Sequence, residues 1–139
     1  KLPVMAKNAT DVTLKRGFEQ HLSETKDQIT KLERVFEILG YDKEKEKCDA
    51  IEGLLKEGEH LIHESQEGPA RDAALIAAGQ KVEHYEIASY GAMCSIAKKL
   101  GKDEAAEILH SILEQEKDTD EKLTSLSYGI EIAAMSNAA

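Results

Sequence analysis

An acidic side chain interrupts an apolar helical pattern in the segment 72–100. The stripe along one face of this segment runs through positions 72, 76, 79, 83, 87, 90, 94 and 97, at the alternating steps of four and three that mark one side of a helix. Glu83 lies in that stripe, with His84 and Glu86 beside it. A carboxylate on the buried side of a helix costs several kcal/mol unless a cation, hydrogen bonds or a metal compensates it. The spacing therefore predicts that Glu83 faces compensating groups on other helices.

Two other long segments carry polar residues in the middle of an apolar face. In segment 13–39 the central positions of the face are His21, Thr25 and Gln28. Glu24 borders this face, three residues after His21, which places the two side chains on neighbouring turns. In the last long segment the corresponding positions are Glu116, Thr119 and Asp120. Three helices with polar breaks near mid-length can bring Glu24, Glu83 and Glu116 to one level of a bundle.

Carboxylates gathered between helices, with an imidazole nearby, are the ligands of carboxylate-bridged di-iron and di-manganese sites. None of the three polar breaks contains the Glu-x-x-His pair that is typical of such sites. The nearest local pairs are His21 with Glu24, Glu83 with Glu86, and Glu116 with Asp120. The alternative is a buried network of salt bridges and hydrogen bonds, with the cations supplied by Lys81, Lys117 and Arg34. Spacing alone does not decide between these two interpretations.

The composition is that of one all-α domain covering residues 1–139. Ala, Leu, Ile, Glu and Lys dominate, strand patterns are absent, and 139 residues are enough to bury a core without disulfides. The formal net charge of −9 argues against nucleic acid or a membrane surface as a partner, since both attract clustered Lys and Arg. No apolar run approaches the roughly 18 residues of a membrane-spanning helix. We therefore expect a soluble protein.

Start and stop signals divide the chain into helices of different lengths. Residues 1–7 are expected to be the end of a first helix whose beginning is not in this sequence. Further helices are predicted at 13–39, 48–65, 72–100 and 103–135, with Gly40 and Gly101 as stops and Pro69 at the start of the third. Short turns between long helices imply antiparallel neighbours. The positions predicted to be buried are Leu14, Phe18, Leu32, Ile76, Ile87, Leu109, Ile112, Leu123 and Leu126.

The remaining reactive side chains are expected to have structural roles. Cys48 and Cys94 are interpreted as reduced thiols that pack as small hydrophobic groups. Tyr85 and Tyr90 could line a redox site, but packing is favoured. Surface positions are predicted for His60, His63 and His110. The sequence has no Cys-x-x-Cys pair, no glycine-rich phosphate loop and no Gly-x-Ser-x-Gly motif, so nothing supports nucleotide binding or triad hydrolysis.

Three blocks of the sequence, 18–28, 71–91 and 114–123, resemble a known family. Together with Lys47-Cys48 and Glu52-Gly53-Leu54, they are similar to the YciF/YciE-like bacterial stress proteins, a ferritin-like family of largely uncharacterised function. The block Gln80–Gly91 is the most specific part of the match. The resemblance implies a rubrerythrin-like antiparallel four-helix bundle with an additional short helix, in a soluble cytoplasmic protein that tends to form a homodimer.

The resemblance also implies a dinuclear site, with iron or manganese as the metal. Carried over residue by residue, its members are Glu24 on one helix, Glu83 with Glu86 on the next long one, Glu116 with Asp120 on the last, and His21 and His84 as ligands or as groups that orient ligands. Members of the family have a further helix ahead of Lys1, with an acidic residue that would complete the site. We therefore expect fewer than two metal ions per chain.

Two functions of different classes follow from the sequence. One is a ferritin-like oxidoreductase or metal-storage protein in which a carboxylate site handles oxygen, peroxide or iron. The other is a stress-induced structural or interaction protein whose polar core binds no metal. Homodimer formation is expected through an apolar flank of the second helix, formed by Leu22, Ile29 and Phe36.

Overall fold

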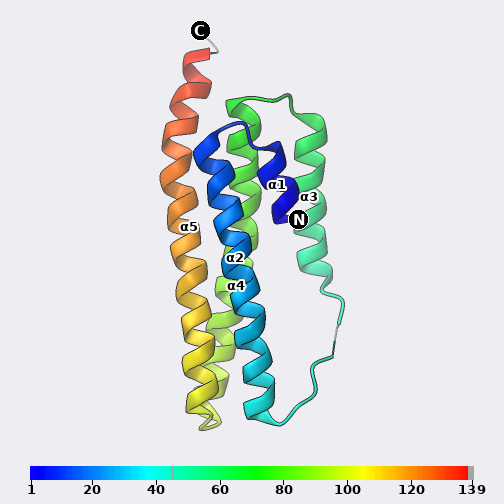
Figure 1. The fold of residues 1–139 in the computed structure, drawn as a ribbon, viewed down its shortest axis with the longest axis vertical. Coiled ribbons are helices and arrows are strands. Elements are labelled where there is room, and N and C mark those ends of the chain that lie inside the picture. The colour runs from blue at the N-terminus through cyan, green and yellow to red at the C-terminus, as the bar shows by residue number, and fades with distance from the viewer. Residues whose placement is uncertain (45, 138–139) are drawn as a thin grey trace.

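The computed structural model describes residues 1–44 and 46–137, and side-chain burial over 1–44 and 46–130. All regular secondary structure in these residues is helical, as the sequence predicts. In chain order the helices are α1 Leu2–Asn8, α2 Val12–Leu39, α3 Asp49–Glu64, α4 Pro69–Lys99 and α5 Asp103–Asn137 (Figure 1). The predicted boundaries agree within about three residues, which is the scatter expected of helix ends.

The three long helices form an up-and-down bundle (Figure 1). α2 and α4 run in the same direction, and α5 runs antiparallel to both and packs against both. α3 packs along α4, while the short α1 packs against the first half of α2. The predicted antiparallel bundle with an additional short helix is therefore confirmed for the described residues. None of their helices is both long enough and apolar enough to cross a membrane.

Local sequence signals explain where α2 begins and ends. The Asp11 carboxylate accepts hydrogen bonds of 2.8 Å from the backbone N–H groups of Thr13 and Leu14, which satisfies donors that lack a partner within the helix. Gly40 ends α2 with φ of 72°, a left-handed conformation that favours glycine.

A buried acid fixes the turn between α1 and α2. Asp72, in the first turn of α4, is only 2% exposed. Its two oxygens accept hydrogen bonds from the backbone N–H groups of Thr10, at 2.7 Å, and Asp11, at 2.8 Å. The sequence pattern predicts that Asp72 lies on the buried stripe. In the structure its carboxylate accepts hydrogen bonds from the backbone N–H groups of this turn.

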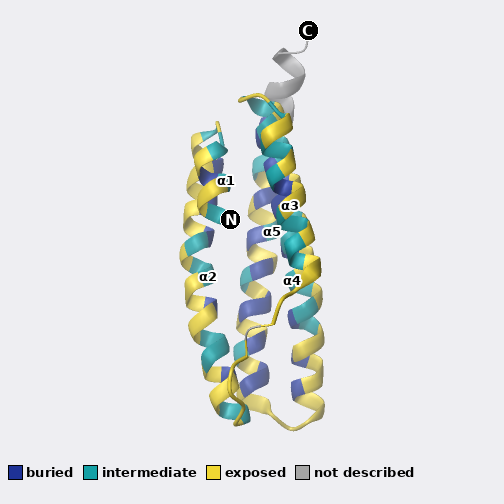
Figure 2. Cartoon of the chain, turned by 90° about the vertical axis from the view of Figure 1, so that its right-hand side faces the viewer, coloured by how far each residue is buried: buried dark blue, intermediate teal, exposed yellow. Residues whose placement is uncertain are grey.

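The core consists of two apolar clusters with a polar layer between them. One cluster comprises Ala6, Leu14, Phe18, Leu75, Ile76, Leu123 and Ile130. The other comprises Val35, Tyr90, Cys94, Ala97, Ala105, Ala106, Leu109, Ile112 and Leu113. Between them along the chain lie the buried polar residues His21, Gln28, Glu83, Glu116 and Thr119. Buried positions on the long helices face the bundle interior (Figure 2).

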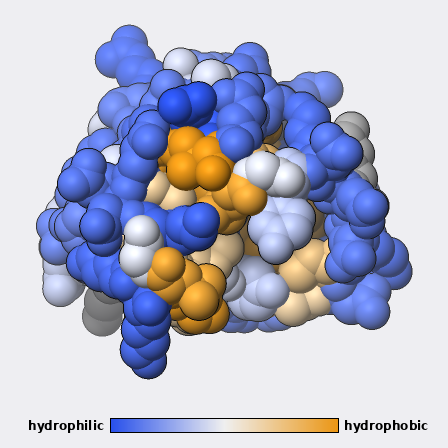
Figure 3. All heavy atoms as spheres, turned by 90° about the horizontal axis from the view of Figure 1, so that it is seen from below, coloured by the Kyte–Doolittle hydropathy of each residue, from blue (hydrophilic) through white to orange (hydrophobic). Residues whose placement is uncertain are grey.

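Six of the nine predicted core residues are buried, and three are only half-buried. Leu32, Ile87 and Leu126 pack at the edges of the clusters instead of inside them. Leu32 lines an open apolar groove between the last turns of α2 and α4, and apolar side chains are visible at that end of the molecule (Figure 3). Helical periodicity identifies the inward face but not which part of that face a neighbouring helix covers.

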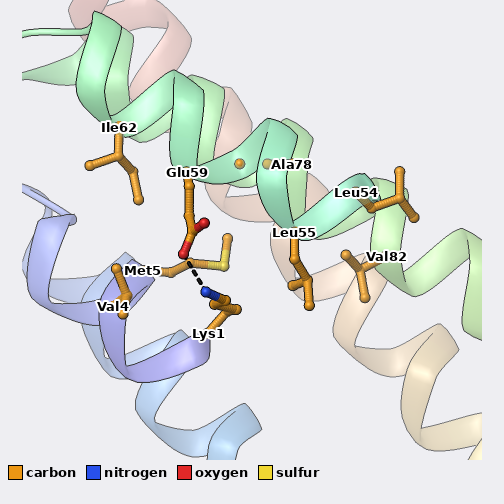
Figure 4. Close-up of a pocket in the computed structure, with 10 residues that line it drawn as sticks. Lys1, Val4, Met5, Leu54, Leu55, Glu59, Ile62, Ala78 and Val82 are labelled. Atoms are coloured by element: carbon orange, nitrogen blue, oxygen red, sulfur yellow. Dashed lines mark hydrogen bonds and ion pairs between the residues drawn. The ribbon is translucent and has the colours of Figure 1, made fainter. Parts of the chain in front are cut away.

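α1 and α3 enclose a small pocket with α4 (Figure 4). Apolar side chains such as Met5, Leu55 and Val82 line it, and an ion pair between Lys1 and Glu59 borders it. Its volume of about 20 Å³ is enough for one water-sized group. This pocket is therefore too small to bind an organic substrate.

Candidate metal centre

Three buried side chains from three different helices meet in the polar layer. They are His21 on α2, Glu83 on α4 and Glu116 on α5, with 7%, 2% and 0% of their surface exposed. His21 Nε2 lies 3.2 Å from Glu83 Oε1. One potential ligand atom from each of the three residues lies within 4.8 Å of the other two. The arrangement is compact enough for all three to contact a single cation.

The neighbours of His21 fix the orientation of its ring. His21 Nδ1 lies 3.4 Å from the hydroxyl oxygen of Thr119, which itself donates a 3.0 Å hydrogen bond to the carbonyl oxygen of Gln115. Because that hydroxyl hydrogen is already used, Thr119 accepts from Nδ1–H, and a neutral His21 then has its lone pair on Nε2. The nitrogen that faces Glu83 is therefore the one available to a metal.

Three of the four carboxylate oxygens of Glu83 and Glu116 lack hydrogen-bond partners. Glu83 Oε2 and both carboxylate oxygens of Glu116 are buried and make no hydrogen bond. Buried polar groups are nearly always satisfied, so three unpaired oxygens in one layer need an explanation. Unlike an ion pair between two side chains, a bound cation would satisfy all three oxygens together.

The cations proposed for a salt-bridge network are engaged elsewhere. Their partners are Glu57 for Lys81, Glu114 for Lys117, and Glu37 and Glu104 for Arg34. Among the residues that the structure describes, no lysine or arginine forms an ion pair with Glu83, Glu86 or Glu116. The network interpretation is therefore wrong in its choice of cations.

Burial and crowding shift the proton equilibria of these acids. Burial, with the charges of Glu86 and Glu83 adding to it, raises the pKa of Glu116 to about 9. Burial also raises the pKa of Glu86 to about 7, helped by the charge of Glu83 and opposed by His21. Burial alone would lower the pKa of His21, but the neighbouring carboxylates, Glu83 first, raise it above its ordinary value. At neutral pH the layer therefore retains protons in place of the missing cations.

Two further acids flank the buried group. Glu24, one turn after His21 on α2, has a carboxylate oxygen 3.7 Å from His21 Nδ1. Its other oxygen accepts a 2.8 Å hydrogen bond from Gln20 and lies 3.5 Å from the Lys122 ammonium. Glu86 is half-buried one turn beyond Glu83 on α4. Both acids lie at the edge of the polar layer.

His84 and Asp120 form a separate pair. The His84 side chain is 69% exposed, and its Nε2 lies 3.3 Å from Asp120 Oδ1. Asp120 Oδ1 also accepts a 3.3 Å hydrogen bond from Gln80. Of the seven residues predicted as ligands, the structure thus gathers His21, Glu83 and Glu116, places Glu24 and Glu86 beside them, and leaves this pair outside. Their roles as ligands stay a prediction.

Sequence reasoning did not select Thr119 and Gln28 as members of the site, although both lie in it. Both residues are nearly fully buried. Each lies on the apolar face of its helix, and this position is the feature of the sequence that could have indicated both residues. Neither amides nor hydroxyls are common metal ligands, which is why the prediction concentrated on acids and imidazoles.

The other candidate side chains lie away from this layer. His60, His63 and His110 are exposed, as predicted. Cys94 is buried in an apolar cluster, but Cys48 is exposed and its sulfur lies 3.2 Å from the Tyr85 hydroxyl. That hydrogen bond lowers the pKa of the Cys48 thiol. Cys48 is therefore not the small hydrophobic core residue that the sequence suggested, because the chain enters α3 at its position.

Comparison with known proteins establishes the family. The family model described as "Domain of unknown function (DUF892)" matches residues 1–135. The chain belongs to this family. It is 46% identical to protein YciF of Escherichia coli K12 over 127 residues, which cover 91% of this chain and 76% of that protein. The predicted resemblance to YciF-like proteins is confirmed.

Solved structures agree with the fold described above. The crystal structure of the E. coli stress protein YciF superposes with a TM-score of 0.90 at 43% identity, covering 93% of this chain and 82% of that one. YcfI of Rhodopseudomonas palustris, for which a structural role has been suggested, gives a TM-score of 0.86 at 41% identity, covering 88% and 78%. The ferritin-like helical bundle therefore holds for this chain as for its relatives.

Proposed function

We propose that this protein is a ferritin-like stress-response protein whose bundle core binds a divalent iron or manganese ion through His21, Glu83 and Glu116. The observation that supports this most directly is the set of three unpaired, buried carboxylate oxygens beside an imidazole. Oxygen and imidazole donors suit both metals. Two ionised carboxylates and a neutral imidazole carry the charge that balances one divalent ion.

A second ion would use the flanking acids Glu24 and Glu86. Glu24 is already compensated by Lys122 at 3.5 Å, and Glu86, whose pKa is about 7, is about half protonated at neutral pH. Both features weaken the attraction for a second cation. We therefore propose one firmly held ion per chain and weaker dinuclear binding. When bound, such ions supply redox chemistry toward oxygen, peroxide or iron.

The residues of this chain prepare the site for metal binding. Thr119 holds the His21 ring so that Nε2 faces the two acids. Ligands must lose their protons before they bind a metal, so Glu116 must release a proton held with a pKa of about 9. Metal affinity should consequently increase with pH.

Elemental analysis after loading with iron or manganese tests the proposal. The wild-type chain should retain about one ion after gel filtration, and the double variant Glu83→Gln, Glu116→Gln should retain none. A matched control is the pair His84→Gln, Asp120→Asn, which removes an imidazole and a carboxylate outside the buried group and should leave metal content unchanged. No retained metal in the wild type would favour the second function.

That second function is a non-enzymatic structural or interaction protein. It is supported by the structural role suggested for YcfI of R. palustris, a relative with the same fold. Under this alternative the acids would remain protonated and the layer would serve fold specificity only. Metal content separates the two functions, because only the first requires an ion in the core.

We also propose that the chain acts in the cytoplasm as a homodimer. Its cysteines are free, as expected in a reducing compartment. Along one face of α2, at steps of seven residues, Ile29 is 53% and Phe36 is 38% exposed, and Leu22 is half-buried. Burying such a strip against a second copy would remove apolar surface from water. Light scattering at tens of micromolar should give twice the monomer mass, and Ile29→Glu should return the monomer mass.

A further inference from the structure

Gln28 stands out among the buried polar residues because its amide nitrogen has no partner. The residue is 4% exposed, and Nε2 makes no hydrogen bond. A buried amide donor without an acceptor is costly, and a leucine at this position of the stripe would avoid that cost. Packing alone therefore does not account for a glutamine here.

The unpaired donor lies beside unpaired acceptors. Gln28 is seven residues after His21 on α2, which places both side chains on the same helix face. Two contacts join α2 to α5 here, Thr119 with His21 and Gln115 with Lys31. Gln28 on α2 and Glu116 on α5, whose two oxygens also lack hydrogen bonds, both lie between these contacts. Burial and the charges of Glu86 and Glu83 raise the pKa of Glu116, whereas the Gln28 amide lowers it. The amide therefore lies near enough to act on the Glu116 carboxylate, although Nε2 makes no hydrogen bond of ordinary geometry.

We infer that Gln28 is a positioning residue for the metal centre: when a cation engages Glu116, the Gln28 amide donates to that carboxylate and holds it in the orientation of a ligand. This inference rests on the proposed metal-binding function and extends it to a residue outside the ligand set. Carboxylate ligands are generally hydrogen-bonded by neighbouring groups, and losing such a partner weakens metal binding by about 10- to 100-fold.

The substitution Gln28→Met tests this role because it keeps the length of the side chain and removes the donor. Calorimetric titration with Mn²⁺ should show affinity at least about 10-fold weaker than in the wild type. The metal-free variant should unfold at the same urea concentration as the wild type or at a higher one, since an unpaired buried amide has been removed. A purely structural role predicts the reverse combination, with lower stability and unchanged affinity.

A matched control is Gln66→Met, since Gln66 is exposed in the connection between α3 and α4. It should bind Mn²⁺ like the wild type. A second measurement does not depend on the variant folding. In wild-type protein labelled with ¹⁵N at glutamine side chains, adding diamagnetic Zn²⁺ should move one buried NH₂ pair downfield as the amide gains a carboxylate acceptor.

The outcomes separate this inference from the function on which it rests. If the wild type binds Mn²⁺ and Gln28→Met binds it equally well, the role of Gln28 is refuted and metal binding stands. The same holds if Zn²⁺ binds but no glutamine side-chain signal moves. If the wild type binds neither ion, both the proposed function and the role of Gln28 are refuted. Weaker binding by Gln28→Met together with the NMR shift supports both.

Discussion

The acids of the polar layer should make the metal-free protein less stable as pH rises from 6 to 8. The pKa of Glu116 is about 9 and that of Glu86 is about 7, both raised mainly by burial from an ordinary value of 4.5. Between the ordinary and the raised pKa the folded chain binds protons that the unfolded chain has released. The free energy of unfolding therefore falls with pH across this interval.

The size of the change in unfolding free energy follows from the number of protons that only the folded state binds. Each proton held only by the folded state costs about 1.4 kcal/mol per pH unit. Glu116 stays protonated through most of the interval and contributes about 3 kcal/mol over two units, while Glu86 releases its proton near pH 7 and adds about 1 kcal/mol. His21, whose pKa is raised, acts in the same direction, because the stability it contributes below its ordinary pKa is lost as pH rises through the raised one. A loss of about 4 kcal/mol is a large part of the stability of a small domain.

Urea denaturation in the presence of a chelator measures this slope. Glu116→Gln keeps a neutral side chain of the same shape, so this variant should lose most of the pH dependence and be more stable than the wild type at pH 8. The control Glu114→Gln replaces an exposed acid that pairs with Lys117 at 2.8 Å, and it should leave the slope unchanged. A wild-type free energy of unfolding that is equal at pH 6 and pH 8, or higher at pH 8, would refute the reasoning. Saturating Mn²⁺ should reduce the slope, since a cation displaces the protons.

Three further predictions concern packing and reactivity. Leu123→Ala should destabilise the protein by about 2–5 kcal/mol because Leu123 is 4% exposed. Leu32→Ala should destabilise it clearly less, because Leu32 borders an open groove. Equal losses of unfolding free energy in urea denaturation would contradict this. Asp72→Ala should cost about 2–3 kcal/mol by leaving two backbone N–H groups unpaired, and thermal unfolding indistinguishable from wild type would rule that role out. Cys48 should react with a thiol reagent more slowly in Tyr85→Phe than in the wild type at pH 7.5, since the lost hydrogen bond raises the pKa of the thiol, and equal rates measured by mass spectrometry would remove the role of the tyrosine.

The fold was predictable from the sequence because helix periodicity and end signals carry most of the information. Leu14, Phe18 and Ile76 lie on stripes that could be placed without knowing their partners, and glycines at the stops fixed the lengths. The degree of burial at the edges of the two apolar clusters was not predictable in the same way. Leu32 and Ile87 occupy stripe positions as good as that of Leu14, yet the neighbouring helix covers only part of their side chains.

The centre of the candidate site was predictable, but its limits were not. Glu83 and Glu116 are stripe positions, so periodicity alone places them in the core. His84 is adjacent to Glu83 in sequence, and a rotation of about 100° per residue turns it away from the stripe. Asp120 lies one turn beyond Glu116, on the part of α5 that faces His84. Which of several acids points inward depends on how each helix is rotated about its axis relative to its neighbours. The apolar pattern of a single sequence does not define that rotation closely enough to choose among them.

The polar layer lies between two apolar clusters of the core, and this arrangement indicates why polar residues occupy it. Apolar clusters on both sides of the layer include fully buried side chains such as Leu14 and Ile112, so the bundle does not depend on the acids for its stability. Replacing a buried polar group by an apolar one of similar size is often stabilising. Here the layer combines unpaired acceptors on Glu83 and Glu116 with an unpaired donor on Gln28. Such a combination costs stability, and a cation bound by the carboxylates, with the Gln28 amide donating to one of them, would recover that cost.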